Sequence, residues 1–212
     1  MASVTRVTRR SPANRQERRE QIERKLLDAT DRLMADGTSF TELSVDRLAT
    51  EAGISRASFY IYFEDKGDLL RRLAGQVFAD LTEDAAKWWV VAGRRDPADV
   101  LAAMTAIVAS YRRHQPVLLA LNEMAGYDAA VGETYRDLLN GISAQFTEVI
   151  EAGQADGSIR PGLPAATTAS SLVWMVERSC QQNLPTRPTS YDAELAASLT
   201  QIIRGALYLA AD

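Results

Sequence analysis

The stretch from Leu43 to Lys66 constrains the fold most, because it reads as two short helices separated by a tight turn. Ser44 and Ser55 each stand where a side-chain hydroxyl can accept a free backbone N–H from the first turn of a helix. Gly53 lies between them, and glycine tolerates the left-handed backbone that ends a helix in a tight turn. The pattern predicts a helix-turn-helix followed by the start of a third helix.

A helix-turn-helix suits DNA, because its second helix enters the major groove and presents its N-terminal residues to base edges. Arg56 can pair bidentately with guanine, and Ala57 can contact a thymine methyl group. The tyrosines and the lysine beyond them have the chemistry for phosphate contacts, which position a protein without reading sequence. The alternative is an ordinary helical hairpin with half-buried tyrosines. The residues expected to bind DNA here are Ser44, Ser55, Arg56, Ala57, Ser58, Tyr60, Tyr62 and Lys66.

Basic residues concentrate at the N-terminus, although the whole chain is acidic. Residues 1–25 contain eight Lys or Arg and three Glu, a net charge of +5, so the other 187 residues carry −9 of the total of −4. Phosphate neutralisation dominates DNA affinity, so this segment is expected to meet an anion. We expect residues 1–14, with Arg9 and Arg10 as DNA contacts, to form a flexible basic arm; the alternative is a solvated tail.

The rest of the chain shows helical periodicity and no strand signal. An apolar stripe from about Arg15 predicts a first helix that completes a three-helix DNA-binding unit in residues 15–65. A helix over residues 66–91 would join this unit to a ligand-binding and dimerisation region in residues 66–212. Pro and Gly breaks divide the remainder into helices expected over 97–113, 116–126, 128–154, 164–184 and 192–211. The prediction is an all-α fold of about nine helices, with an N-terminal helix-turn-helix unit and a C-terminal helical bundle.

The last two expected helices have the features of a dimer interface. Small residues in 164–184 permit close helix approach, and residues 192–211 carry a broad apolar stripe. Antiparallel pairs of this type can pack against a copy of themselves as a four-helix bundle. The alternative is that they close the chain's own core. The expected interface residues are Leu172, Val176, Leu195, Leu199, Ile202, Ile203 and Ala206.

Large and polarizable residues in the middle helices indicate a ligand pocket, since such pockets are mostly apolar and contain a few orienting polar groups. Glu123 and Gln181 are further candidates for those polar groups. The alternative is that these side chains form ordinary core. The expected ligand-binding residues are Trp88, Met104, Tyr111, Asn122, Met124, Phe146, Trp174, Met175 and Glu177.

Composition argues against several other functions. One histidine and one cysteine in 212 residues exclude a Cys/His metal cluster. His114, expected at the surface or as a helix cap, and Cys180 have no third residue that spacing suggests would orient them as a catalytic pair. No apolar run is long enough to span a bilayer, and no secretory signal is evident. We therefore expect a cytoplasmic protein that is not an enzyme, makes no membrane contact, and uses no cofactor or metal.

One run of residues, GISRASFYIYF from Gly53 to Phe63 with Lys66 beyond it, resembles the signature of the TetR family of bacterial transcriptional regulators. The resemblance extends over about residues 22–70 and is closest to the EthR-like branch. A tyrosine stands at Tyr62, where many relatives carry histidine, and both side chains can donate to a phosphate.

The resemblance implies an all-helical homodimer that pairs through its last two long helices. It also implies a ligand cavity in the C-terminal helices, which is long and mostly apolar in the EthR-like branch. The segment MVER from Met175 to Arg178 is similar to a Met-Asn-Glu-Arg segment of that branch. Val176 stands where the branch has a ligand-orienting asparagine, so the same ligand hydrogen bond is not expected from this position.

These features predict a ligand-responsive transcriptional regulator. The expected mechanism is a repressor that binds a palindromic double-stranded DNA operator as a homodimer and is released by a small, largely apolar effector. Two alternatives are a helical DNA-binding protein without a ligand switch, and a carrier or enzyme for a hydrophobic small molecule.

Overall fold

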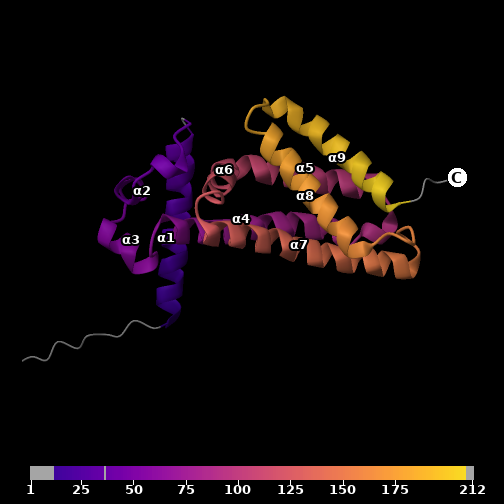
Figure 1. The fold of residues 1–212 in the computed structure, drawn as a ribbon, viewed down its shortest axis with the longest axis horizontal. Helices are drawn as coiled ribbons and strands as arrows, with labels where there is room; N and C mark the ends of the chain where they lie inside the picture. Colours follow the sequence, from indigo (N-terminus) through magenta and orange to yellow (C-terminus); the bar gives the residue numbers. More distant parts are fainter. Residues whose placement is uncertain (1–11, 36, 209–212) are drawn as a thin grey trace, which may run out of the picture.

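The computed structural model describes residues 12–35 and 37–208, and this part of the chain folds into nine α-helices without a strand. Figure 1 shows a small N-terminal unit beside a larger helical bundle, which contains the longest helices. The all-α prediction is confirmed. The helices are α1 (Pro12–Met34), α2 (Val45–Glu51), α3 (Arg56–Tyr62), α4 (Lys66–Trp89), α5 (Pro97–Arg113), α6 (Gln115–Met124), α7 (Ala129–Asp156), α8 (Ala165–Asn183) and α9 (Asp192–Leu207).

The first helix begins earlier than expected. Its first residue is Pro12, which suits a first helical turn because the missing N–H of proline would have no intrahelical partner there. Residues 12–14 therefore belong to α1 rather than to an arm. The expected DNA contacts Arg9 and Arg10 lie outside the described residues.

The N-terminal unit encloses a core of its own. Leu26 of α1 is fully buried with Phe40, which lies in a short 3-10 turn, η1 (Phe40–Glu42). Phe59 and Phe63 come from α3 and its end, and their ring centroids lie 5.2 Å apart. Two phenylalanines four residues apart share one helix face, so they direct that face of α3 inward and leave the opposite face to solvent.

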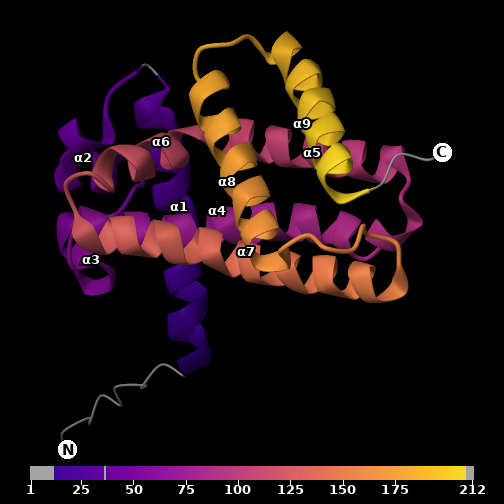
Figure 2. The same ribbon diagram turned by 45° about the vertical axis from the view of Figure 1, so that its right-hand side comes forward.

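The C-terminal bundle is built on two long helices that run side by side, α4 and α7 (Figure 2). Helix α8 packs on α7, and α9 packs on α5, which in turn lies on α4. The shorter α6 crosses back to contact α1 and η1, so it connects the bundle to the N-terminal unit. No helix in the described ranges has both the length and the apolar character needed to cross a bilayer.

The apolar stripe on the last helix faces inward rather than toward a second copy. Leu195, Leu199 and Ile203 are at most 5% exposed, because they face the α5 side of the bundle. Leu172 is also buried, and Val176 is half-buried and lines an internal cavity. Four of these five residues are thus buried within the chain itself, and they offer a second copy little surface in this conformation. Among the expected residues, Ala206 is half-buried and Ile202 is 51% exposed.

Candidate functional site

The helix-turn-helix forms with the local geometry expected from its sequence. The hydroxyl of Ser44 accepts a hydrogen bond from the backbone N–H of Arg47 at 3.1 Å. The hydroxyl of Ser55 accepts one from the N–H of Ser58 at 3.0 Å. Gly53 has φ of +66°, the left-handed conformation that connects α2 to α3. The two predicted caps and the predicted turn are confirmed.

The outer face of α3 displays the residues with DNA-binding chemistry. Arg56 and Ala57 are exposed at its N-terminal end, and Tyr60 is 49% exposed. Ser58 and Tyr62 are half-buried. A further residue, Ile61, is 74% exposed and was not expected to take part. The sequence does indicate this exposure, because Ile61 is two residues from both inward-facing phenylalanines and therefore lies on the opposite side of the helix.

The guanidinium of Arg56 is held by two neighbours. Its Nη1 donates to Asp46 Oδ2 of α2 at 2.6 Å, and its Cζ lies 5.7 Å from the centroid of the Tyr60 ring. Both side chains of the ion pair are about 60% exposed, so the pair is open to exchange with another anion. The arginine is thus positioned at the surface with a replaceable partner.

Lys66 has a different role from the phosphate contact that was expected. Its ammonium donates to the carbonyl oxygens of Phe40 at 3.2 Å, Thr41 at 2.9 Å and Leu43 at 2.6 Å. An ammonium has three donors, so these bonds use its full capacity. Burial lowers the pKa of Lys66, and the carboxylate of Glu123 partly offsets that effect. Lys66 therefore fixes the loop before α2 to the first turn of α4.

The same loop is held from the other side by Glu123 of α6. The hydroxyls of Ser39 and Thr41 both donate to Glu123 Oε1. Burial opposes ionisation of Glu123, but these hydrogen bonds outweigh it and lower the pKa of the carboxyl. Glu123 was expected as a polar group of the ligand pocket; it instead contacts the N-terminal unit, because α6 turns toward α1.

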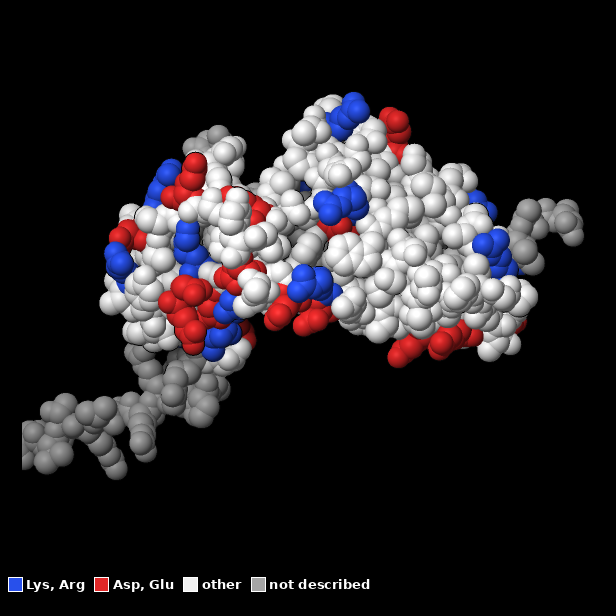
Figure 3. Space-filling view, in the orientation of Figure 1, with Lys and Arg blue, Asp and Glu red and all other residues white. Residues whose placement is uncertain are grey.

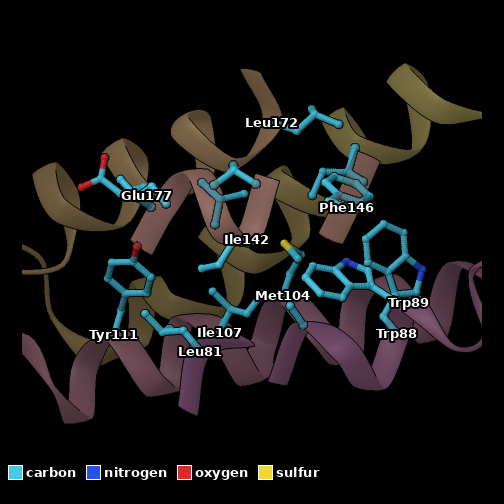
Figure 4. A pocket seen from close by; sticks show the side chains of 15 residues that line it. Leu81, Trp88, Trp89, Met104, Ile107, Tyr111, Ile142, Phe146, Leu172 and Glu177 are labelled. Atoms are coloured by element: carbon cyan, nitrogen blue, oxygen red, sulfur yellow. The ribbon is translucent and has the colours of Figure 1, made fainter. Parts of the chain in front are cut away.

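An apolar cavity of about 70 Å³ lies inside the bundle, lined by side chains from α4, α5, α7, α8 and α9 (Figure 4). Trp88, Met104, Tyr111, Phe146 and Glu177 line it as expected, and the lining residues that the sequence analysis did not name for this pocket include Leu81, Trp89, Ile107 and Ile142. Three residues expected at the dimer interface, Leu172, Val176 and Ile203, also line the cavity.

Four of the expected ligand-binding residues lie elsewhere. Asn122 is exposed on α6, and Met124 is half-buried at its end, because that helix does not reach the cavity. Trp174 and Met175 are half-buried on α8 and are not among the residues that line the cavity. The Trp174 ring packs edge-on against Tyr135, with 6.4 Å between centroids.

One end of the cavity is polar. Glu177 is 2% exposed, and the hydroxyl of Tyr135 donates to its Oε1. Gln181 Nε2 donates in turn to the Tyr135 hydroxyl at 2.8 Å. Burial raises the pKa of Glu177, although the hydrogen bond from Tyr135 and the charge of Arg178 act against it. Burial also raises the pKa of Tyr111.

His114 occupies a helix-cap position, one of its two expected roles, because it ends α5 and precedes α6; its side chain makes no capping hydrogen bond and is not at the surface. It is 6% exposed at the corner between α5 and α6, and its Nε2 lies 3.0 Å from Asp80 Oδ2 on α4. Burial lowers the pKa of His114, and Asp80 partly offsets this. The contact fastens the corner to α4.

Comparison with known proteins gives two family matches. Residues 26–73 match the model of bacterial regulatory proteins of the tetR family, and residues 100–208 match that of the C-terminal domain of the transcriptional regulator EthR. The chain is 29% identical to the HTH-type transcriptional regulator EthR of Mycolicibacterium smegmatis over 85% of this chain and 83% of that protein. It is 30% identical to the HTH-type transcriptional repressor LfrR of the same species, over 65% of this chain and 74% of that one.

Solved structures share the fold at low identity. The transcriptional regulator FadR of Bacillus subtilis, solved in complex with stearoyl-CoA, aligns with a TM-score of 0.69 at 12% identity and covers 89% of this chain and 99% of its own. A TetR-family regulator from Rhodococcus aligns with a TM-score of 0.68 at 20% identity, over 91% of this chain and 99% of its own. These likenesses support the helical architecture described above.

Proposed function

We propose a ligand-released repressor as the function of this chain, which belongs to the TetR family of bacterial regulatory proteins and carries an EthR-type C-terminal domain. It is a transcriptional regulator with a DNA-binding N-terminal domain and a ligand-binding C-terminal domain, and not an enzyme. We take residues 12–65 as the former and residues 66–208 as the latter. Because its target is chromosomal DNA, the proposed site of action is the cytoplasm.

One observation carries the proposal: a single helix, α4, is part of both sites. At its first turn, Lys66 holds the carbonyls of the loop before α2. At its far end, Trp88 and Trp89 line the cavity. A ligand that favours a different position of α4 therefore acts on the elements that orient α3. Such coupling is typically worth ~1–3 kcal/mol.

In the proposed complex, the exposed face of α3 enters the major groove. Arg56 exchanges Asp46 for a guanine edge, and Ala57 and Ile61 make apolar contacts with base methyl groups. The hydroxyl-bearing residues position the protein on phosphates, and the basic N-terminus adds further phosphate contacts. The residues proposed for these phosphate contacts are Ser44, Ser55, Ser58, Tyr60, Tyr62, Arg9 and Arg10.

Two copies are proposed to pair through the outer faces of α8 and α9. Figure 3 shows that this side of the bundle carries few charged side chains, whereas the N-terminal unit is crowded with them. The exposed face of α9 includes Ala197, Ser198, Gln201 and Ile202, a small and mostly uncharged surface that a second copy could cover. A two-fold dimer places its recognition helices about one DNA turn apart, ~34 Å, or at a related spacing, and so favours a palindromic operator.

Selection of bound fragments from genomic DNA tests this function. We expect enrichment of an inverted repeat, a dimer in sedimentation, and placement of the repeat over a promoter. The variant Ile202→Glu should sediment as a monomer and lose affinity for the repeat. Val90→Glu, which places the same charge on an 87% exposed apolar position outside the proposed interface, should remain a dimer. Binding without sequence preference would favour an architectural DNA-binding protein, and absence of DNA binding would favour a carrier.

A further inference from the structure

Glu177 is a buried acid with one unpaired oxygen. Its side chain lines the apolar cavity from α8. The hydroxyl of Tyr135 donates to Oε1, but Oε2 is buried and has no hydrogen-bond partner among the described residues. Buried polar atoms in folded proteins are nearly always paired, so an unpaired carboxyl oxygen on a side chain that lines a cavity points to a missing partner.

The hydrogen bonds around Glu177 indicate what that partner must be. Gln181 donates to the hydroxyl of Tyr135, which donates its own hydrogen to Glu177. Tyr135 thus donates to the carboxyl group and Gln181 orients Tyr135, an arrangement that favours a negative charge on Glu177 although burial opposes it. An ionised carboxylate only accepts hydrogen bonds, so Oε2 fits a donor, and a positively charged N–H is the strongest one.

The other end of the cavity suits the apolar part of such a ligand. Trp89 and Phe146 are nearly parallel, at 13° with 6.0 Å between centroids, and Trp88 meets Phe146 edge-on at 5.5 Å. Figure 4 shows Glu177 and Tyr111 at one end of the lining and these rings at the other. Aromatic faces stack on flat groups and attract cations. The lining contains no Lys or Arg that could hold an anionic ligand.

We propose that the cavity binds a small amphipathic amine, with its ammonium on Glu177 Oε2 and its aromatic or alkyl body directed toward Trp88 and Phe146. The cavity of about 70 Å³ is smaller than such a ligand, so binding requires the lining side chains, including Glu177, to move. The inference deepens the proposed function, on which it rests only in taking this cavity as the effector site. It excludes carboxylic acids, whose charge Glu177 would repel, and it ranks neutral alcohols of the same shape below the amines.

The experiment compares amines with alcohols of equal length on the full chain without DNA. Calorimetry with 2-phenylethylamine and 4-phenylbutylamine, against 2-phenylethanol and 4-phenylbutanol, should show that at least one amine binds about tenfold more tightly than its alcohol, because its hydrogen bond is charge-assisted. Glu177→Gln keeps the volume and removes the charge, so it should abolish the preference while alcohol binding changes by less than about threefold. Tyr135→Phe keeps the ring and removes the donor, and it should reduce the preference without abolishing it.

A second measurement uses the unmodified protein. Amine affinity should rise with pH as Glu177 ionises, whereas alcohol affinity should stay level. The ionisable groups that face Glu177 are Tyr111 on α5, Tyr135 on α7, and Arg178 and Cys180 on α8. Burial raises the pKa of Cys180 to about 12 and raises the pKa of both tyrosines, so a loss of amine preference at low pH is assigned to Glu177, whose pKa burial also raises.

Three results would overturn the proposal: no amine that binds better than its alcohol, a preference that persists in a folded Glu177→Gln protein, or amine affinity that does not change with pH. Circular dichroism establishes that each variant is folded. Because DNA is absent, the outcome is separate from repression. If the protein binds amines but amines do not release it from operator DNA, only the proposed ligand release is contradicted. If neutral ligands alone release it from the operator, only the amine proposal is contradicted.

Discussion

Arg56 of the second helix in the helix-turn-helix is paired with Asp46 of the first, with 2.6 Å between Nη1 and Oδ2. The residue best suited to read a base is therefore held by a carboxylate on the same surface. The pair holds the guanidinium in place, but the carboxylate must give way when a guanine or phosphate arrives.

The variant Asp46→Asn should strengthen DNA binding by roughly 0.5–1 kcal/mol on every sequence, because an exposed ion pair contributes little and a negative charge near phosphate opposes binding.

Arg56→Ala should instead weaken operator binding by roughly 1–3 kcal/mol and relax specificity at one base position. Fluorescence anisotropy on operator and scrambled DNA measures both. Glu42→Gln removes an acid from the same unit without touching Arg56, and an equal gain from it would show that only net charge matters.

Replacement of Lys66 by methionine should reduce the free energy of unfolding by roughly 1 kcal/mol, because it removes three hydrogen bonds to partly exposed carbonyls. The salt dependence of DNA binding should keep its slope. Lys87→Met is the control, since that lysine is 63% exposed and its loss should leave the stability nearly unchanged. If the variant instead kept its stability and showed a weaker salt dependence of DNA binding, Lys66 would be a phosphate contact, as the sequence suggested.

Loss of the Glu123 carboxylate should reduce communication between the two sites. In Glu123→Ala the loop before α2 is no longer bonded to α6, so the ratio of operator affinities without and with effector should shrink by about 0.5–2 kcal/mol. Ligand affinity in the absence of DNA should stay close to that of the unmodified chain. Asn122→Ala alters the neighbouring exposed position on α6. If it reduced the affinity ratio equally, Glu123 would have no specific role in the coupling.

Gly67 lies at a close approach that the sequence does not reveal. A Cβ atom at Gly67 would lie 2.6 Å from Asp128 Oδ2, the carboxylate that caps α7. Asp128 caps α7 through Oδ1, so Gly67→Ala should force this carboxylate to shift and weaken the cap, which destabilises the protein by up to about 1 kcal/mol. Gly75→Ala lies on the same helix with open space around it, and should stabilise by about 0.5–1 kcal/mol. Thermal melts that ranked the two variants equally would contradict the contact.

Asp31 should make stability depend on pH. Burial, then repulsion by Asp28, raises its pKa from 3.8 to about 6, although Arg32 acts against them. An acid with a raised pKa contributes stability below its unfolded pKa and loses it as pH rises through the folded value. Asp31→Asn should therefore melt like the parent near pH 4 and at a higher temperature near pH 8. The exposed Glu17→Gln should show no such divergence.

Local signals in the sequence were sufficient for the helix-turn-helix and for many helix boundaries. The caps at Ser44 and Ser55, and the turn at Gly53, depend on residues within a few positions of one another. Helix α5 likewise begins at a capped proline and occupies the expected residues. Such features need no knowledge of the rest of the fold.

Features that depend on tertiary packing were not predictable in the same way. Helical periodicity shows that α9 has an apolar face, but it does not say whether that face meets α5 or a second copy. The chemistry of Lys66 fits a phosphate as well as three carbonyls, and only the approach of residues 40–43 decides between them. Glu123 has no sequence signal that would connect it to residues more than 80 positions earlier.

Because α4 is long, a small movement at its cavity end is enlarged at its DNA-binding end. Lys66 and Trp88 are 22 residues apart on one uninterrupted helix, which corresponds to about 33 Å at 1.5 Å per residue. If the cavity end stays in place, a tilt of about 5° displaces the Lys66 end by about 3 Å, close to the 3.4 Å rise of one base pair. A pocket that rearranges by little more than a side-chain rotation can therefore misalign the DNA-reading helix by nearly one step of the duplex.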